Sequence, residues 1–204
     1  MPLIETTPAL LVLWALIGYG LGAIPFGMVL ARLMNLGNLR DIGSGNIGAT
    51  NVLRTGNKTA AALTLLLDAG KGAAALLLAR AVTGHEDAAQ LAGLMAMLGH
   101  CYPVWLKFNG GKGVATFLGL LLALHFPVGV GACIAWLVGA AVFRISSMGA
   151  LVAAAASTFL MMFLDKPDAL LLGVVLTLLI FWRHRANISR IRAGTEPKIG
   201  QKST

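Results

Sequence analysis

The stretch ALLVLWALIGYGLGAIPFGMVLARL, residues 9–33, decides the fold of this chain. It exceeds the roughly 20 apolar residues that a helix needs to cross a bilayer, and Arg32 is its only charged residue. No Lys or Arg precedes it, so we expect it to be kept as a helix rather than removed as a signal peptide. The whole chain is 57% hydrophobic and 12% charged, with a mean hydropathy of +0.80. This composition predicts an all-α integral membrane protein and argues against a soluble domain.

Apolar windows separated by charged residues, Gly or Pro predict about seven transmembrane helices. These windows lie near residues 9–33, 59–82, 89–106, 114–125, 128–143, 148–164 and 168–182. The fourth is short and is separated from the fifth only by His125-Phe126-Pro127. Little chain remains for an extramembrane domain, so residues 1–204 are predicted to form a single polytopic membrane domain.

Lys and Arg are distributed unequally between the two sets of alternate connections. One set carries Arg32, Arg40, Arg54, Lys58, Lys107, Lys112, Arg144, Arg183, Arg185, Arg190, Arg192, Lys198 and Lys202, whereas the other carries Arg80 and Lys166. Because cytoplasmic loops are enriched in Lys and Arg, we expect the N-terminus outside and the C-terminus in the cytoplasm. The glycine-rich loops then face the cytoplasm.

The first glycine-rich loop reads Gly43-Ser44-Gly45-Asn46-Ile47-Gly48-Ala49-Thr50-Asn51. Where side chains are absent, several backbone N–H groups can converge on one anion. Residues 49–54 can form a short helix whose N-terminus, with the hydroxyls of Ser44 and Thr50 and the guanidinium of Arg54, would supply donors to a phosphate. The alternative is a flexible, solvated loop.

The second loop, Phe108-Asn109-Gly110-Gly111-Lys112-Gly113, lies where one predicted span ends and the next begins. A phosphate is the expected ligand at such a helix start, beside a lysine. The loop is not a nucleotide-binding P-loop, because Leu106 stands where glycine is required and Gly113 stands where Ser or Thr would hold magnesium. Nucleotide hydrolysis is therefore not supported.

Polar groups also follow the later spans. Ser146 and Ser147 come directly after the fifth span, and His184, Asn187 and Arg190 are spaced to share one face of a helix in the tail. The alternative for the tail is an electrostatic contact with lipid phosphates.

Two charges, Asp68 and Lys71, lie inside the second span at positions i and i+3. An unpaired charge there costs roughly 2.5–3.5 kcal/mol, so a structural ion pair is the simplest interpretation. Direct contact with a substrate is the alternative. Cys101 and Cys133 have no metal-ligand spacing and are interpreted as small core residues.

Five segments carry a family resemblance. GSGNIGATNVLR, LDAGKG, GHCYPVWLKFNGGKGVAT, FRISS and HRANISRIRAGTE begin at residues 43, 67, 99, 143 and 184. Together they resemble, over nearly the whole chain, the bacterial acyl-phosphate:glycerol-3-phosphate acyltransferases of the PlsY family. The resemblance implies a seven-helix enzyme of the bacterial cytoplasmic (inner) membrane with its active site facing the cytoplasm. Such enzymes transfer a fatty acyl group from acyl phosphate to the 1-hydroxyl of sn-glycerol 3-phosphate, which gives lysophosphatidic acid and phosphate.

The resemblance also implies which residues form the site. The implied catalytic residues are Ser44, Arg54, Lys112, His184 and Asn187. The implied substrate-binding residues are Gly43, Gly45, Asn46, Thr50, Asn51, Gly110, Gly111, Gly113, Ser147 and Glu196, with Ser146 as the alternative to Ser147. No metal, cofactor or nucleic acid is expected. The expected partners are the two substrates and the lipid bilayer, and the enzyme that makes acyl phosphate is a candidate protein partner.

The inventory of side chains suits this chemistry. An acyl phosphate is a mixed anhydride with a good leaving group, so the enzyme mainly needs positioning and charge stabilisation. The His-x4-Asp pair of thioester-dependent acyltransferases is absent, because Gln90, Trp105, Val130 and Ser189 stand at the aspartate position after the four histidines. We therefore expect direct transfer in which a substrate phosphate takes the hydroxyl proton. His184 as general base is the competing mechanism.

Two other functional classes of membrane protein fit the sequence less well. A phosphate transporter would need cationic sites near the middle of the membrane and repeated halves, and the sequence shows no internal repeat. A phosphatidyl-group transferase or lipid phosphatase would usually show an acidic metal cluster or a phosphate-attacking histidine, whereas the eight carboxylates of this chain are mostly single.

Overall fold

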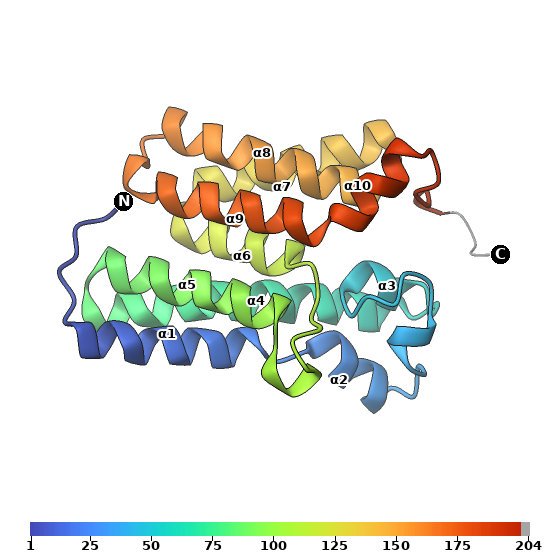
Figure 1. The fold of residues 1–204 in the computed structure, drawn as a ribbon, viewed down its shortest axis with the longest axis horizontal. Helices are drawn as coiled ribbons and strands as arrows, with labels where there is room; N and C mark the ends of the chain where they lie inside the picture. The colour runs from blue at the N-terminus through green and yellow to red at the C-terminus, as the bar shows by residue number, and fades with distance from the viewer. Residues whose placement is uncertain (201–204) are drawn as a thin grey trace. The chain divides into compact units, whose positions relative to one another are not determined.

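The computed structural model describes residues 1–200, and within them every regular element is a helix (Figure 1). Lys202, one of the cations assigned to the cytoplasmic side, lies outside the described residues. The chain divides into two compact units, residues 2–124 and, together with Met1, residues 125–200.

The first unit contains six α-helices and two short 3-10 turns. The helices are α1 (Pro8–Gly22), α2 (Phe26–Leu33), α3 (Ala49–Leu53), α4 (Lys58–Thr83), α5 (Glu86–Cys101) and α6 (Val114–Leu124), and the turns are η1 (Leu39–Asp41) and η2 (Val104–Leu106). Within this unit α5 packs against both α1 and α4, and α4 also packs against α6 (Figure 1).

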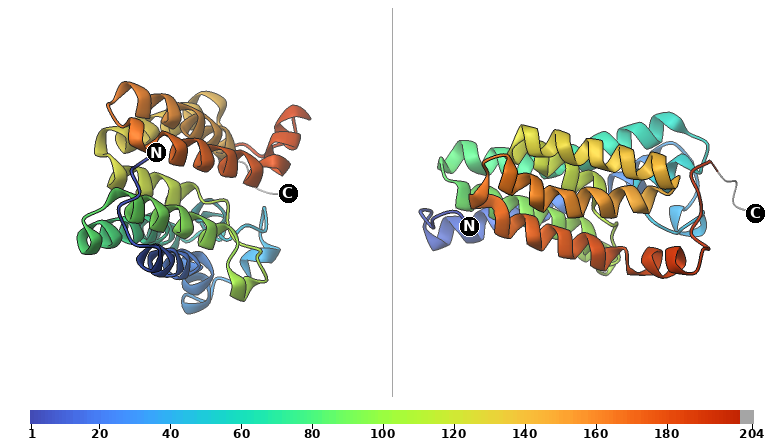
Figure 2. Two further views of the ribbon diagram at one scale, coloured as in Figure 1. Left: turned by 60° about the vertical axis from the view of Figure 1, so that its left-hand side comes forward. Right: turned by 90° about the horizontal axis from the view of Figure 1, so that it is seen from above.

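The second unit is formed by α7 (Phe126–Phe143), α8 (Ser146–Phe163), the 3-10 turn η3 (Pro167–Ala169), α9 (Leu170–Arg183) and α10 (Arg185–Arg192). α8 packs against α7 and α9, and α10 leaves the end of α9 at an angle of 60° (Figure 2).

Each predicted span coincides with a helix or a pair of helices, and the short helix predicted near residues 49–54 is α3. In the described chain, four stretches are long and apolar enough to cross a membrane: Pro8–Leu33, α4, α7 and α8. The bent pair formed by Pro167–Arg183 and α10 would be a fifth. α6 has 11 residues and is only about 16 Å long, roughly half of a hydrocarbon core. The all-helical membrane fold is confirmed, whereas the count of seven crossings and their orientation stay predictions.

Two predicted spans differ from the observed helices for local reasons. The span 89–106 is a helix only to Cys101, because Pro103 cannot continue the hydrogen-bond ladder. The span 9–33 is broken at Pro25 for the same reason. At this break the Ala23 carbonyl accepts the indole N–H of Trp105 at 2.7 Å, and the Ile24 carbonyl accepts Lys71 Nζ at 2.7 Å.

Small residues allow the helices of the first unit to approach closely. A Cβ added to Gly18 would lie 2.3 Å from the Ala92 carbonyl oxygen across the α1–α5 contact. At Gly119, on α6, a Cβ would lie 2.1 Å from the Ala69 carbonyl oxygen of α4. This is the packing typical of helices in membranes, where small side chains bring backbones into van der Waals contact.

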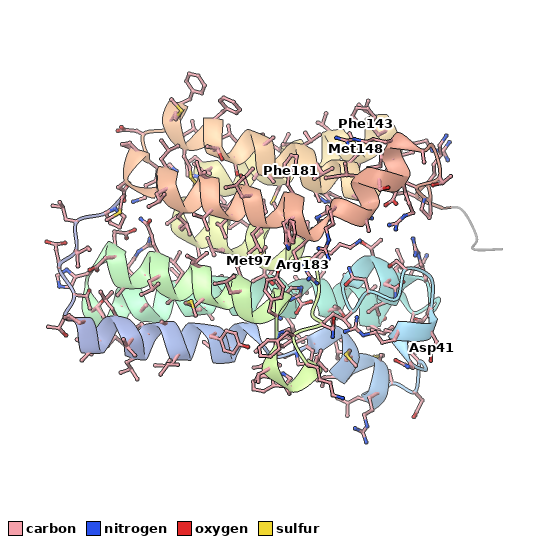
Figure 3. The ribbon with its side chains drawn as sticks, viewed as in Figure 1. Asp41, Met97, Phe143, Met148, Phe181 and Arg183 are labelled. Atoms are coloured by element: carbon pink, nitrogen blue, oxygen red, sulfur yellow. The ribbon has the colours of Figure 1, made fainter. Side chains whose placement is uncertain are left out.

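The turn between α7 and α8 anchors the C-terminal tail of the second unit. Phe143 and Met148 flank this turn (Figure 3), and Arg144 within it has a left-handed backbone with φ of 57°. The Arg144 carbonyl accepts the backbone N–H of Ile199 at 2.7 Å. The tail therefore returns to the start of α8, where Ser147 lies.

Candidate active site

Asn51 organises the first glycine-rich loop. Its side chain is buried and donates from Nδ2 to the carbonyls of Leu39 at 2.9 Å and Asn46 at 2.7 Å. Its Oδ1 accepts the backbone N–H of Ser44 at 3.1 Å and the Ser44 hydroxyl at 3.3 Å. These bonds use most of the hydrogen-bonding capacity of the amide, so Asn51 fixes the shape of the loop.

The exposed side of the same loop carries Gly43, Ser44, Thr50 and Arg54. Gly43 has a φ of 53°, and a Cβ there would lie 2.6 Å from both Cδ and Nη1 of Arg54. The Arg54 side chain is thus folded back across Gly43, beside Ser44. Residues 1–200 provide no carboxylate within ion-pair distance of Arg54, so its charge faces solvent on this surface.

The second loop is attached to the end of α5. The backbone N–H of Gly110 donates to the Cys101 carbonyl at 3.1 Å, and that of Gly111 donates to the His100 carbonyl at 3.0 Å. A Cβ at Gly113, whose φ is 83°, would lie 2.1 Å from Cε of Met97 on α5 (Figure 3). The glycines are therefore required by packing, and two of the amides expected to hold phosphate are already bonded within the protein.

Other donors lie at the start of α6. The first bond of its ladder runs from the N–H of Phe117 to the Gly113 carbonyl, so the amides of residues 114–116 precede the ladder. Lys112 is adjacent to this helix start and is half-buried. The predicted placement of the loop at a helix N-terminus is confirmed.

Arg40 joins the two loops. Its guanidinium donates to the carbonyl of Gly45 in the first loop at 3.1 Å and to the carbonyl of Asn109 in the second. The planar fork of arginine is suited to two such acceptors at once. The segments that carry Arg54 and Lys112 are thus held together as one surface.

A buried ionic cluster lies behind the second loop. Lys71 Nζ is 2.7 Å from Asp68 Oδ1, and both side chains are 3% exposed. Nδ1 of His100 lies 3.7 Å from the same carboxylate oxygen. The structural ion pair predicted for Asp68 and Lys71 is present, and it also contacts the break in the first span through the Ile24 carbonyl.

His100 connects this cluster to the loop. A Cβ at Gly111 would lie 2.1 Å from Nε2 of His100 and 2.9 Å from its Cε1, so the imidazole packs directly against Gly111. The ring is buried and cannot withdraw into solvent. Asp68, His100 and Gly111 therefore form a continuous series of contacts from α4 to the loop.

Glu196 is the centre of the polar cluster in the second unit. Its Oε1 accepts the Ser147 hydroxyl at 2.7 Å and Asn187 Nδ2 at 2.5 Å, and its Oε2 lies 2.6 Å from Arg190 Nε. Ser147 therefore belongs to this cluster, and the choice between Ser147 and Ser146 as substrate-binding residue stays a prediction. Burial opposes ionisation of this carboxyl, but the hydrogen bonds from Asn187, Ser147 and Arg190 together lower the pKa of Glu196 below its ordinary value.

His184 lies between α9 and α10 and is buried. Its Nδ1 is 2.8 Å from the Ile180 carbonyl oxygen. Because a carbonyl only accepts, Nδ1 carries the hydrogen, and in the neutral ring the lone pair is then on Nε2. The imidazole is thus held in the tautomer that can accept a proton at Nε2.

The structure places the site residues inferred from sequence in both units. The first unit holds Gly43, Ser44, Gly45, Asn46, Thr50, Asn51, Arg54, Gly110, Gly111, Lys112 and Gly113, and the second holds Ser147, His184, Asn187 and Glu196. Sequence reasoning gave no role to His100 or Arg40. Both act across long sequence separations, and the only available signal was their position beside the glycine-rich segments. No group of three or more metal-binding side chains occurs in the part of the chain that the structure describes.

Comparison with known proteins gives one consistent result. A family model described as glycerol-3-phosphate acyltransferase matches residues 12–194. Glycerol-3-phosphate acyltransferase of Roseobacter denitrificans is 71% identical over 200 residues, which cover 98% of this chain and 100% of that protein. The protein of the same name from Ruegeria pomeroyi is 70% identical over 203 residues, which cover 100% of both chains.

Two solved structures are similar over nearly their whole length. Both are crystal structures of PlsY, an integral membrane glycerol 3-phosphate acyltransferase. The glycerol 3-phosphate form has a TM-score of 0.88 and 36% identity, and the match covers 93% of this chain and 96% of that chain. The lysophosphatidic acid form has a TM-score of 0.83 and 34% identity, with coverage of 93% and 95%.

The contact between His100 and Gly111 predicts a specific coupling. Gly111→Ala should destabilise the protein by about 1–3 kcal/mol, because its Cβ would overlap the buried imidazole. In His100→Ala the space is open, so the double variant should be no less stable than His100→Ala alone. Thermal unfolding in detergent measures all three variants. Gly70→Ala is the matched control, because a Cβ there meets nothing within 4 Å. If the losses of stability in Gly111→Ala and His100→Ala simply add in the double variant, the contact between His100 and Gly111 is contradicted.

The lowered pKa of Glu196 predicts a pH-dependent tail. A carboxyl with a depressed pKa stabilises the folded state above its ordinary pKa and loses this contribution as the pH falls through the folded value. Hydrogen exchange of residues 184–199, corrected for the intrinsic rate at each pH, should therefore accelerate on acidification below about pH 4.5. Glu196→Gln should show fast exchange already at neutral pH, and Glu5→Gln should behave as wild type. An acid-insensitive tail would show that the cluster does not depend on the charge.

Proposed function

Since the chain belongs to the PlsY family of glycerol-3-phosphate acyltransferases, we propose that it transfers a fatty acyl group from acyl phosphate to the 1-hydroxyl of sn-glycerol 3-phosphate. The products are lysophosphatidic acid and inorganic phosphate, and the reaction is the first acylation of phospholipid biosynthesis. The PlsY structures in forms named for glycerol 3-phosphate and lysophosphatidic acid support this acceptor and this product.

The observation that carries the proposal is the joining of the two glycine-rich loops by Arg40. Each loop contributes one of the cations Arg54 and Lys112, and both substrates of the reaction carry a phosphate. Cations and helix-start amides that are fixed before the substrate arrives stabilise charge without reorganisation. Lys112 and the start of α6 bind one phosphate, and Arg54 with Ser44 and Thr50 binds the other.

The reaction needs no covalent intermediate on the protein. The 1-hydroxyl oxygen of glycerol 3-phosphate forms a bond to the acyl carbonyl carbon, and the bond from that carbon to the phosphate oxygen breaks. Phosphate leaves with the bonding electrons, and the hydroxyl proton goes to a phosphate oxygen of a substrate. Since the mixed anhydride is already activated, correct placement and charge stabilisation provide most of the acceleration.

The polar cluster of the second unit orients the acceptor. Glu196 holds Ser147 and Asn187 by short hydrogen bonds, which fixes the rotamers of both side chains. From the family resemblance, Asn187 and His184 are the proposed catalytic residues of this unit. His184 is the competing general base, because its protonated Nδ1 leaves the lone pair on Nε2.

We place the enzyme in the bacterial cytoplasmic (inner) membrane as a multi-pass protein with the glycine-rich loops on the cytoplasmic face. The support for this orientation is the Lys and Arg distribution between alternate loops. The enzyme that produces acyl phosphate is the proposed protein partner, because an unstable, amphiphilic donor is best received near its source.

The donor is tested with purified protein in detergent, glycerol 3-phosphate and, in separate reactions, acyl phosphate, acyl-CoA or acyl-carrier protein. We expect lysophosphatidic acid and an equal amount of phosphate in the reaction with acyl phosphate, and no product in the reactions with acyl-CoA or acyl-carrier protein. Acylation from the thioesters without acylation from acyl phosphate would refute the donor. Phosphate uptake into vesicles without an acylated product would instead support a transporter.

The two proton-transfer mechanisms differ in their dependence on His184. If a substrate phosphate takes the proton, His184→Ala should keep a near-normal kcat across the pH range while KM changes. If His184 is the essential base, kcat should fall by about 10²–10⁴-fold. Steady-state kinetics at several pH values measure this difference. Asn187→Ala is a useful comparison, because it removes a positioning group of the same cluster without removing an ionisable one.

A further inference from the structure

The turn between α5 and α6 exposes a row of large apolar side chains beside the candidate active site. Val104, Trp105 and Phe108 are 49%, 55% and 58% exposed. Val104 and Trp105 belong to the η2 turn, and Phe108 is the first residue of the second glycine-rich loop. The proposed catalytic chemistry does not use any of these three side chains.

Local structure holds this row outward. Lys107 and Phe108 have φ values of 50° and 60°, and two consecutive non-glycine residues in the left-handed region are unusual. Their backbone N–H groups donate to the carbonyls of Val104 and Pro103, each at 3.0 Å. The indole N–H of Trp105 is bonded to the Ala23 carbonyl at 2.7 Å, which fixes the orientation of the ring. The exposure is therefore a property of an ordered turn.

A cationic depression adjoins the apolar row. It has a volume of about 490 Å³ and is lined by Arg40, Trp105, Leu106, Lys107 and Asn109. Its lining contains two cations and no carboxylate. The nearby Asp41, at the edge of the first loop (Figure 3), is not part of the lining and accepts a hydrogen bond from Asn38 Nδ2 at 2.9 Å. The described residues give Lys107 no carboxylate partner.

The combination of groups selects one kind of occupant. Aromatic side chains with an apolar face are favoured at the level of lipid head groups, and each Lys or Arg near the surface attracts an anionic lipid by about 1 kcal/mol. A soluble anion would leave the apolar row without a ligand, and a neutral lipid would leave the charge of Lys107 without a counter-charge. An anionic phospholipid satisfies both, because its phosphate lies next to its acyl chains.

We infer that the depression formed by Arg40, Lys107 and Trp105 binds the head group of an anionic phospholipid of the surrounding bilayer, whose chains lie along Val104, Trp105 and Phe108. Arg40 also holds the Gly45 and Asn109 carbonyls, so a lipid phosphate here contacts the residue that joins the two glycine-rich loops. A lipid of the bilayer thereby helps to hold Arg40, and through it the two glycine-rich loops, in place. The inference does not depend on which acyl donor the enzyme uses.

Tryptophan quenching tests the inference without reference to catalysis. Trp14, Trp136 and Trp182 are replaced by Phe, and the protein is placed in lipid nanodiscs that contain equal mole fractions of brominated phosphatidylglycerol or brominated phosphatidylcholine. We expect stronger quenching of Trp105 by the brominated phosphatidylglycerol. Lys107→Gln should reduce the preference for phosphatidylglycerol about fivefold, the effect of one lost cation. Lys58→Gln, an exposed cation outside the depression, should leave it unchanged.

Three results would overturn the inference. Equal quenching by the two lipids would show lipid exposure without a head-group site. A preference that survives Lys107→Gln would place the anion elsewhere. Protection of Trp105 that increases with the number of protein copies per nanodisc would assign this surface to a second copy of the chain. If the triple replacement lowers the yield of folded protein, the same quantity is obtained as the difference in quenching between wild type and Trp105→Phe.

Discussion

The ion pair of Lys71 and Asp68 is the interaction on which the arrangement of the first unit depends. Two charges inside a span are costly alone, and removal of one partner of a buried pair typically costs 3–5 kcal/mol. Here the pair does more than neutralise itself. Lys71 also holds the Ile24 carbonyl, where Pro25 interrupts the first apolar run, and Asp68 faces His100 at the end of α5. One pair on α4 thus fixes the broken first span and the helix that carries the glycine-rich loop.

In the second unit, a single carboxylate holds polar groups from different helices together. Glu196 gathers donors from α8 and α10, which are far apart in sequence, and the return of the tail to Arg144 brings it there. A single acceptor with three donors gives each of them a defined rotamer, which is what a positioning cluster requires. In both units a buried or half-buried acid therefore sets the geometry of polar groups that belong to different helices.

The sequence predicted the local features well and the long-range contacts poorly. Apolar runs identified the helices other than α3 and α10, and the spacing of Asp68 and Lys71 identified their pairing, because these signals are contained within one or a few turns. The short helix expected at residues 49–54 is α3. By contrast, Arg40 contacts Asn109 and Trp105 contacts Ala23 across long stretches of chain, and no periodicity predicts such pairs. The glycines were predicted to bind phosphate, whereas their packing against His100 and Met97 became evident only in three dimensions.

The attachment of Gly110 and Gly111 to the last carbonyls of α5 has a consequence for the thermodynamics of ligand recognition. Since two backbone bonds and the packing of Gly111 and Gly113 on α5 hold it, the second loop can swing away only if both bonds break and these contacts open. For the proposed phosphate ligand such a loop is a preformed receptor, because its conformational entropy is lost when the chain folds rather than when the ligand arrives. Association at this loop should then resemble the docking of an ion on a rigid surface, with a small heat-capacity change and little dependence on loop motion.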